Sequence, residues 1–164
     1  MTIYFADGTN IATAPTGGKV LSKPVLGALT STVSTQGSNS WTDLAGMSVT
    51  ISPASSSSRI HLVCHLAITG DTDTNSDTTY ARLRLLRGST QIDDGDASSN
   101  WWLSRHSLQR TDTYTFCVID HPNTTSSTTY KVQRYNPSNN RSLIIGYTKL
   151  PNNGGELWAT EYDN

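Results

Sequence analysis

Two histidines four positions apart are the first residues whose spacing suggests metal chemistry. On a helix, His61 and His65 would share one face and could bind the same ion. The apolar residues around them alternate, however, which is typical of a β-strand. On a strand the two side chains lie about 13 Å apart, at about 3.3 Å per residue, too far for one zinc ion. We interpret them, with Arg59, as a polar or subunit-facing surface, and burial between subunits would make assembly pH-sensitive.

An acidic loop offers oxygen ligands at alternate positions, an arrangement that suits Ca²⁺. The four candidates are Asp71, Asp73, Asn75 and Asp77. A helix–loop–helix calcium site needs Gly at the sixth position and Glu at the twelfth, where this loop has Ser76 and Arg82. A solvated loop is therefore the favoured interpretation and a calcium site the alternative. The acidic residues at 93–96 are interpreted in the same way. No cofactor and no other metal is expected.

The residues that catalysis usually requires do not form a recognisable pattern. The sequence has no nucleophile elbow, no phosphate-binding glycine loop and no paired-cysteine zinc spacing. Its four histidines and two cysteines do not suggest a nucleophile pair. We therefore predict that the protein is not an enzyme. For Cys64 and Cys117, two buried small hydrophobic side chains are the favoured interpretation, and a disulfide between adjacent strands stays open.

Aromatic residues are the remaining candidates for a binding role. Six of them could form an oligomer interface or a ligand platform: Trp101, Trp102, Tyr135, Tyr147, Trp158 and Tyr162. Trp41 is a further candidate for stacking on sugars. Adjacent residues of a strand point to opposite faces, so Trp101 and Trp102 cannot both enter one core. At least one of them is expected to be exposed or covered by another subunit.

The stretch at 58–69 organises the elements that would position these residues. Five apolar residues alternate with polar or smaller ones: Ile60, Leu62, Cys64, Leu66 and Ile68. This pattern predicts a long strand with one buried face, in the middle of a sheet. Similar patterns and turn signals predict other strands at 30–35, 47–51, 80–87, 90–93, 101–103, 114–118, 128–135, 142–148 and 156–162. No segment predicts a helix. The expected fold is all-β: a jelly-roll β-sandwich with an extended N-terminal arm.

The N-terminal residues differ from the rest of the chain because they show no sustained periodicity. Residues 1–28 are predicted to be an anchoring arm, in which Ile3, Tyr4 and Phe5 could add as a short strand to a partner. A flexible tail is the alternative. Residues 29–164 are predicted to form the jelly-roll domain.

Composition narrows the class of protein further. Of 164 residues, 35% are hydrophobic and 15% charged, and 21 Ser and 24 Thr favour strands over helices. Lys and Arg number 12 against 13 Asp and Glu, and a net charge of -1 argues against a nucleic-acid partner. The sequence has no run of about 18 apolar residues, so no membrane span is predicted. The first residues do not resemble a secretory signal, so folding in a cytosol is expected.

Several segments follow one another in a distinctive order: Trp41 with Met-Ser-Val-Thr-Ile-Ser-Pro at 47–53, and then 55–60, 85–92, 120–122, 124–133 and 157–161. Taken together, they resemble the jelly-roll domains of bacteriophage fibre and decoration proteins, especially those of marine and cyanobacterial phages. Those domains are similar to the C1q/tumour-necrosis-factor trimeric jelly roll. The resemblance covers roughly residues 40–162, whereas residues 93–112 do not match it. It implies a homotrimer without catalytic residues, and an arm that attaches to tail, capsid or adaptor proteins.

The sequence therefore supports three hypotheses. The first is a virion structural protein, a trimeric tail fibre or capsid decoration assembled in the host cytoplasm, whose head touches host-surface glycans or stiffens the particle. The second is a carbohydrate-binding module that acts as a monomeric lectin-like domain. The third, a secreted C1q-like ligand, is disfavoured because no secretory signal is recognised.

Overall fold

The computed structural model describes residues 20–34, 40–70, 79–93, 101–105, 111–135 and 143–163. These ranges consist almost entirely of strands, with one short 3-10 helix, η1 (Pro151–Gly154). The strands are β1 (Val25–Ala28), β2 (Val33–Ser34), β3 (Trp41–Ile51), β4 (Arg59–Gly70), β5 (Thr79–Arg87), β6 (Thr90–Gln91), β7 (Trp101–Arg105), β8 (Thr111–Asp120), β9 (Thr128–Tyr135), β10 (Leu143–Ile145) and β11 (Gly155–Tyr162). None of the described helices has the length and apolar character that crossing a membrane requires.

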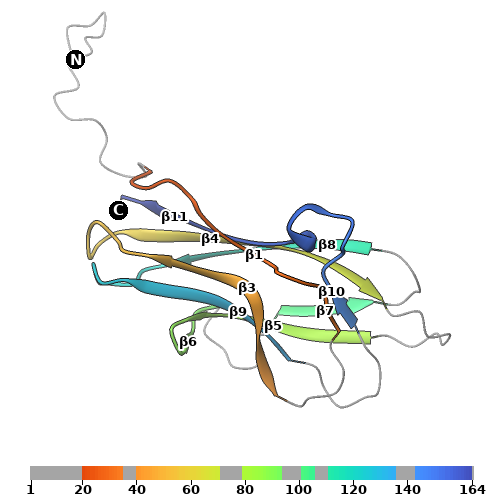
Figure 1. Ribbon diagram of the computed structural model, residues 1–164. Coiled ribbons are helices and arrows are strands. Elements are labelled where there is room, and N and C mark those ends of the chain that lie inside the picture. The colour runs from red at the N-terminus through yellow and green to blue at the C-terminus, as the bar shows by residue number, and fades with distance from the viewer. Residues whose placement is uncertain are drawn as a thin grey trace, which may run out of the picture.

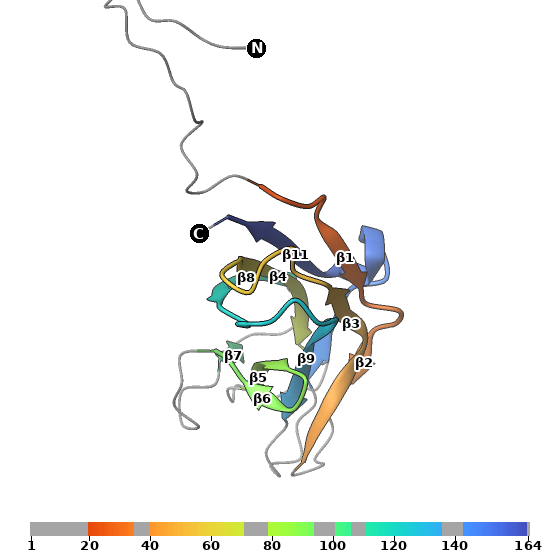
Figure 2. The ribbon, with the colours of Figure 1, turned by 90° about the vertical axis from the view of Figure 1, so that its left-hand side faces the viewer.

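The strands form two antiparallel sheets that face each other (Figure 1). In the first sheet, β4 pairs with β11 and β10 along one edge and with β8 along the other, and β1 extends the sheet beyond β11. In the second sheet, β5 pairs with β9 on one side and with β6 and β7 on the other, and β3 lies beyond β9. Figure 2 shows the two layers end-on, with β8, β4, β11 and β1 above β7, β5, β9 and β3.

The connections between the eight main strands define a jelly roll. Along the chain, β1, β4, β8 and β11 belong to the first sheet, and β3, β5, β7 and β9 belong to the second. Every step except that from β5 to β7 passes from one sheet to the other. Eight antiparallel strands wound between two sheets in this way make a double-sheet jelly roll. The predicted all-β, jelly-roll β-sandwich is confirmed.

Alternating side chains of facing strands fill the space between the sheets. The predicted apolar face of β4 is buried, and Ile60 and Leu66 are both 0% exposed. Across the core, the second sheet contributes Met47, Leu83, Leu85, Tyr130 and Val132. Burial of apolar side chains in each layer is the main force that holds such sandwiches together.

Two glycines allow the sheets to approach at one side of the sandwich. Gly27 of β1 lies against the carbonyl oxygens of Gly46 and Ser48 in β3, so no side chain fits between the strands. Gly46 also has a φ of 84°, which favours glycine. On the other side, β8 is more open: its inward residues Tyr114, Phe116 and Val118 are only partly buried against the core.

The N-terminal boundary of the sandwich lies earlier in the chain than predicted. Residues 25–28, which the sequence assigned to the arm, form β1 and pair with β11. Val20 also forms an isolated bridge with Tyr162. The strand predicted at 30–35 is shorter in the structure, since among the described residues of that range only Val33–Ser34 form a strand. Residues 1–19, including Ile3, Tyr4 and Phe5, lie outside the described residues.

The two cysteines occupy opposite faces of the first sheet. Cys64 faces the core, where burial raises the pKa of its thiol to about 12. Cys117 pairs with Val63 in register and is exposed on the outer face. Both thiols are free. The prediction of a buried cysteine is right for Cys64 and wrong for Cys117, because one residue of register reverses the face of a strand.

Candidate binding surfaces

The outer face of the first sheet carries a row of apolar side chains that crosses all four main strands. The register places Leu26 of β1 beside Trp158 of β11, Trp158 beside Val63 of β4, and Val63 beside Cys117 of β8. Leu26 is 42% exposed and Cys117 is exposed, whereas Trp158 and Val63 are half-buried. We call Leu26, Trp158, Val63 and Cys117 the apolar row. A continuous row of this kind is typical of an interaction surface.

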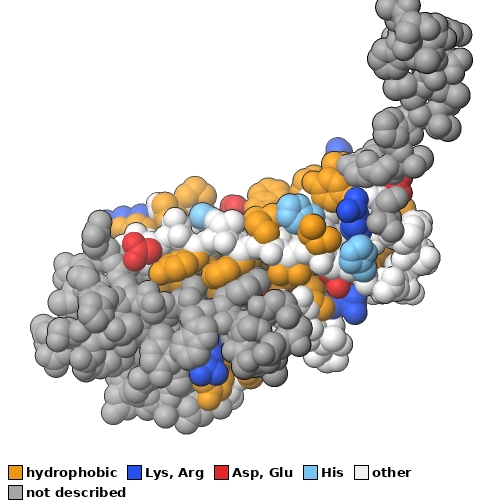
Figure 3. Space-filling model, turned by 180° about the vertical axis from the view of Figure 1, so that it is seen from behind, with side chains coloured by type: hydrophobic (Ala, Val, Ile, Leu, Met, Phe, Trp, Pro, Cys, Tyr) orange, Lys and Arg blue, Asp and Glu red, His pale blue; other side chains and the backbone are white. Residues whose placement is uncertain are grey.

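Histidines and one further apolar side chain border the apolar row. In the next register position, Ile119 of β8, 60% exposed, lies beside His61. At one end of the face, Arg59, His61, Ile119 and Tyr162 line a shallow cavity of about 300 Å³. The His61 and Tyr162 rings lie 6.1 Å apart. Seen from behind, on the side where β8 lies, hydrophobic side chains form a band with histidines beside it (Figure 3).

The outer face of the second sheet carries an array of aromatic rings and guanidinium groups. The Trp41 and Tyr135 rings, paired across β3 and β9, have centroids 5.3 Å apart and planes tilted by 42°. The Arg84 guanidinium carbon lies 4.2 Å from the Trp41 ring centroid, and that of Arg82 lies 5.8 Å from the Tyr135 centroid. Contacts at these distances are cation–π interactions.

Polar side chains hold the Arg84 end of this array in place. The Arg84 Nε and Nη2 groups donate to the Gln133 Oε1 atom at 2.8 and 2.6 Å. Gln133 Nε2 donates to Asp43, which also accepts from Lys131 Nζ at 2.9 Å. Burial raises the pKa of Asp43, but the bonds from Gln133 and Lys131 lower it by more, so the net shift is downward. The carboxylate is therefore charged near neutral pH, and burial lowers the pKa of Arg84.

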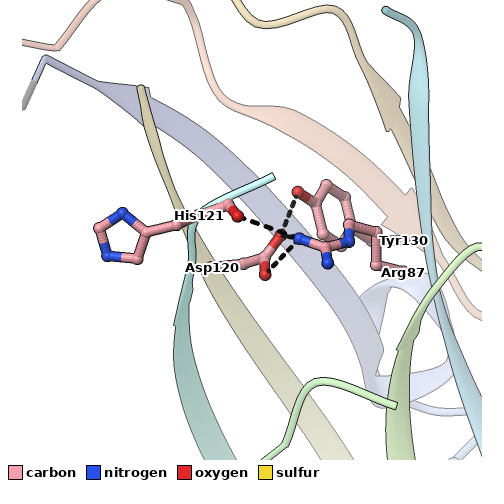
Figure 4. Close-up of polar contacts among 4 residues, drawn as sticks. All are labelled: Arg87, Asp120, His121 and Tyr130. Carbon is pink, nitrogen blue, oxygen red and sulfur yellow. Dashed lines mark hydrogen bonds and ion pairs between the residues drawn. The ribbon is translucent and has the colours of Figure 1, made fainter. Parts of the chain in front are cut away.

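A third cluster joins the two sheets through the carboxylate of Asp120 (Figure 4). Arg87 Nη1 donates to Asp120 Oδ1 at 2.9 Å and to Oδ2 at 3.0 Å, and the Tyr130 hydroxyl donates to Oδ2 at 2.7 Å. Arg87 also donates to the His121 carbonyl oxygen at 3.1 Å. Burial, with Asp120 as neighbour, raises the pKa of Tyr130. The carboxylate already accepts hydrogen bonds at both oxygens, so the cluster is suited to holding β8, β5 and β9 together.

The structure distributes the predicted aromatic residues over both sheets. Trp158 and Tyr162 share the outer face of the first sheet, whereas Tyr135 lies on the second. Tyr147 follows β10, where its N–H donates to the Asn153 carbonyl oxygen at 2.7 Å. In β7, Trp101 and Trp102 pair through the backbone with Leu83 and Arg82 of β5. The described positions therefore do not form one common site.

The calcium candidates Asp71, Asp73, Asn75 and Asp77 lie outside the described residues. Within the described ranges, no group of three or more His, Cys, Asp or Glu side chains is placed to hold a metal ion. Sequence reasoning considered Trp41 and Tyr135 as ring candidates, whereas Arg82 and Arg84 were not considered as their partners. It did not place the two rings beside the two arginines, because the pairing of β3 and β5 with β9 could not be predicted.

The comparisons with known proteins identify only distant structural likeness. No protein-family model and no curated protein matches the chain. Among solved structures, the chain is similar to a chain of the T13 particle of infectious bursal disease virus, with a TM-score of 0.45 and 12% identity over 86% of this chain and 35% of that one. The Gx strain of the same virus gives a TM-score of 0.43 and 11% identity over 99% of this chain and 42% of that one. The chain thus spans less than half of the viral chains it matches.

Proposed function

We propose that the protein is a non-enzymatic structural protein of a phage virion, a homotrimeric tail fibre or capsid decoration. Its jelly-roll head would be presented outward, and its N-terminal residues would attach it to tail, capsid or adaptor proteins. The observation that carries this proposal is the apolar row on the outer face of the first sheet. The trimeric state and the phage class come from the sequence resemblance to phage fibre and decoration domains.

The apolar row supports self-association because its composition suits a buried contact. Leu26, Trp158, Val63 and Cys117 lie on four adjacent strands, so they form one surface rather than scattered exposed residues. Ile119 extends this surface and is 60% exposed. Contact with a second copy would remove this apolar area from water, which stabilises the complex by about 25 cal/mol per Å² of apolar surface buried. A stable interface of this kind buries about 800 Å² on each partner.

The start of the sandwich supports attachment through the preceding residues. Val20 bridges to Tyr162, and the Leu21 N–H donates to the Glu161 carbonyl oxygen at 2.9 Å. The chain therefore enters the domain along β11, beside the proposed contact face. A segment that enters there can reach a neighbouring copy or another virion protein without crossing the core.

Sedimentation equilibrium of the purified full chain tests the proposal. We expect the mass of three copies at micromolar concentration, and monomers for Val63→Arg, because a charge in the apolar row opposes burial. Ser48→Arg is the matched control, since Ser48 is exposed on the outer face of the second sheet. It should leave the trimer intact. A monomeric wild type, or a Val63→Arg variant that remains trimeric, would contradict the proposal.

A carbohydrate-binding module that acts as a monomer is the second candidate. The observation in its favour is the pair of rings, Trp41 and Tyr135, on the outer face of the second sheet. It predicts glycan binding by a monomeric wild type, so the same sedimentation experiment distinguishes the two candidates.

A further inference from the structure

We infer that the outer face of the second sheet binds a carboxylate-bearing saccharide, with Trp41 and Tyr135 as the stacking platform and Arg82 and Arg84 as the carboxylate-binding groups. This inference goes beyond the proposed function and rests on it, because it assumes a head that is presented outward. It uses the face of the sandwich opposite the apolar row. A homotrimer built through the first sheet would leave this face pointing outward.

The rings provide the apolar part of the site. Trp41 and Tyr135 are both half-buried and lie at the end of adjacent strands, 5.3 Å apart. Their planes are tilted by 42°, and the Arg84 and Arg82 guanidinium groups lie over them, so a sugar would stack on the part of this angled platform that the guanidinium groups leave open. Sugar rings present C–H groups on one face and hydroxyls at the edge, and amphipathic aromatic residues suit such ligands.

The hydrogen-bonding network around Arg84 orders the site before a ligand arrives. Gln133 fixes two Arg84 nitrogens, and Asp43 fixes Gln133. Lys131 in turn holds Asp43. Because Gln133 takes the Nε–H and one Nη2–H of Arg84, a ligand carboxylate would contact the Nη1 side of a guanidinium that is already ordered and loses little further freedom on binding.

The charges on this face favour an anionic ligand. Three cations, Arg82, Arg84 and Lys131, lie with one partly exposed carboxylate, that of Asp43. The buried carboxylate of Asp93 also acts on Arg84, so among these described residues the cations exceed the carboxylates by one. The local excess of positive charge contrasts with the net charge of -1 for the whole chain. A uronic or other acidic sugar would complement the rings and the guanidinium groups together.

Single-stranded nucleic acid is the other ligand that rings and arginines can bind. The observations favour the saccharide because the chain as a whole is slightly acidic, whereas nucleic-acid binders carry extended basic surface. The experiment therefore includes an oligonucleotide as a competing ligand.

Calorimetric titration of the trimeric full chain tests the inference. The probes are hexasaccharides of galacturonate, mannuronate and hyaluronan, the methyl ester of each hexamer, and a thymidine octamer. We expect at least one uronate to bind, and its methyl ester to bind about tenfold more weakly. Arg84→Gln and Trp41→Leu should each weaken binding about tenfold or more. Lys149→Gln, which removes an exposed cation elsewhere, should leave it unchanged.

The outcomes separate this inference from the proposed function. Absence of binding to all three uronates by trimeric wild type would overturn the inference and leave the virion proposal standing. Equal binding of the uronate and its ester, or tighter binding of the thymidine octamer, would also overturn it. Because Trp41→Leu could weaken folding, its circular dichroism spectrum is compared with that of wild type. Arg84→Gln changes a half-exposed residue, so its effect on binding tests the inference even if Trp41→Leu does not fold.

Discussion

The carboxylate of Asp120 offers a direct test of how the two sheets are joined. Asp120 ends β8 in the first sheet, whereas its partners Arg87 and Tyr130 belong to β5 and β9 in the second. Asp120→Ala removes the contacts from Arg87 at 2.9 and 3.0 Å and the contact from the Tyr130 hydroxyl at 2.7 Å. We expect a clear loss of stability with the fold retained.

The size of this loss follows from the exposure of the two partners. Tyr130 is 0% exposed, so its hydroxyl would be left without an acceptor, at a cost of about 1–3 kcal/mol. The Arg87 side chain is 31% exposed, and water can replace part of its ion pair, so this loss adds about 1 kcal/mol. The free energy of unfolding should therefore fall by about 2–4 kcal/mol.

A double-mutant cycle in urea measures whether the cluster acts as a unit. Tyr130→Phe alone should cost about 1 kcal/mol, because it removes one hydrogen bond to Asp120. In the Asp120→Ala background the same change should cost nothing or restore stability, since it removes the orphaned hydroxyl. Purely additive costs, or a loss below about 1 kcal/mol for Asp120→Ala, would refute this account of the cluster.

Three other predictions concern the core, the closed side of the sandwich and alkaline stability. Met47→Ala should lower the free energy of unfolding by about 2–5 kcal/mol in urea, because Met47 is 0% exposed, while the exposed Ser48→Ala should change little. Gly46→Ala should lower the melting temperature more than Gly88→Ala: both glycines have positive φ, but only the methyl at Gly46 meets a carbonyl oxygen. Tyr130 has a folded-state pKa above its ordinary value of 10.0, so its contribution to stability is full below pH 10.0 and falls as the pH rises further. Wild type should lose more stability than Tyr130→Phe between about pH 8 and about pH 11, and equal losses would count against this assignment.

Elements with strong alternation could be predicted closely from the sequence. The strand expected at 58–69 is β4 at Arg59–Gly70, and the one expected at 128–135 is β9. Each alternates between a buried face and a polar one, and the period of two fixes which residues enter the core. Residues 25–28 were missed because Val-Leu-Gly-Ala follows a proline and contains a glycine, which weaken a strand pattern. β1 exists because β11 pairs with it, and that partner lies more than a hundred residues away.

The candidate surfaces depend on pairing that no local pattern specifies. Leu26, Trp158, Val63 and Cys117 each look isolated in the sequence, and only the register of four strands joins them. The same holds for Trp41, Tyr135 and Arg84, which come from β3, β9 and β5. Sequence reasoning can therefore name the residue types of such a site but not its members.

The rate at which Cys117 reacts with a thiol reagent, followed against protein concentration, tests the proposed contact face most directly. Cys64 is buried and its pKa is raised to about 12, so Cys117 is expected to supply the reactive thiol. We predict slow labelling of Cys117 at concentrations where the proposed trimer forms, and fast labelling on dilution or in Val63→Arg. Fast labelling at every concentration, equal in wild type and Val63→Arg, would contradict the placement of the subunit contact on the first sheet.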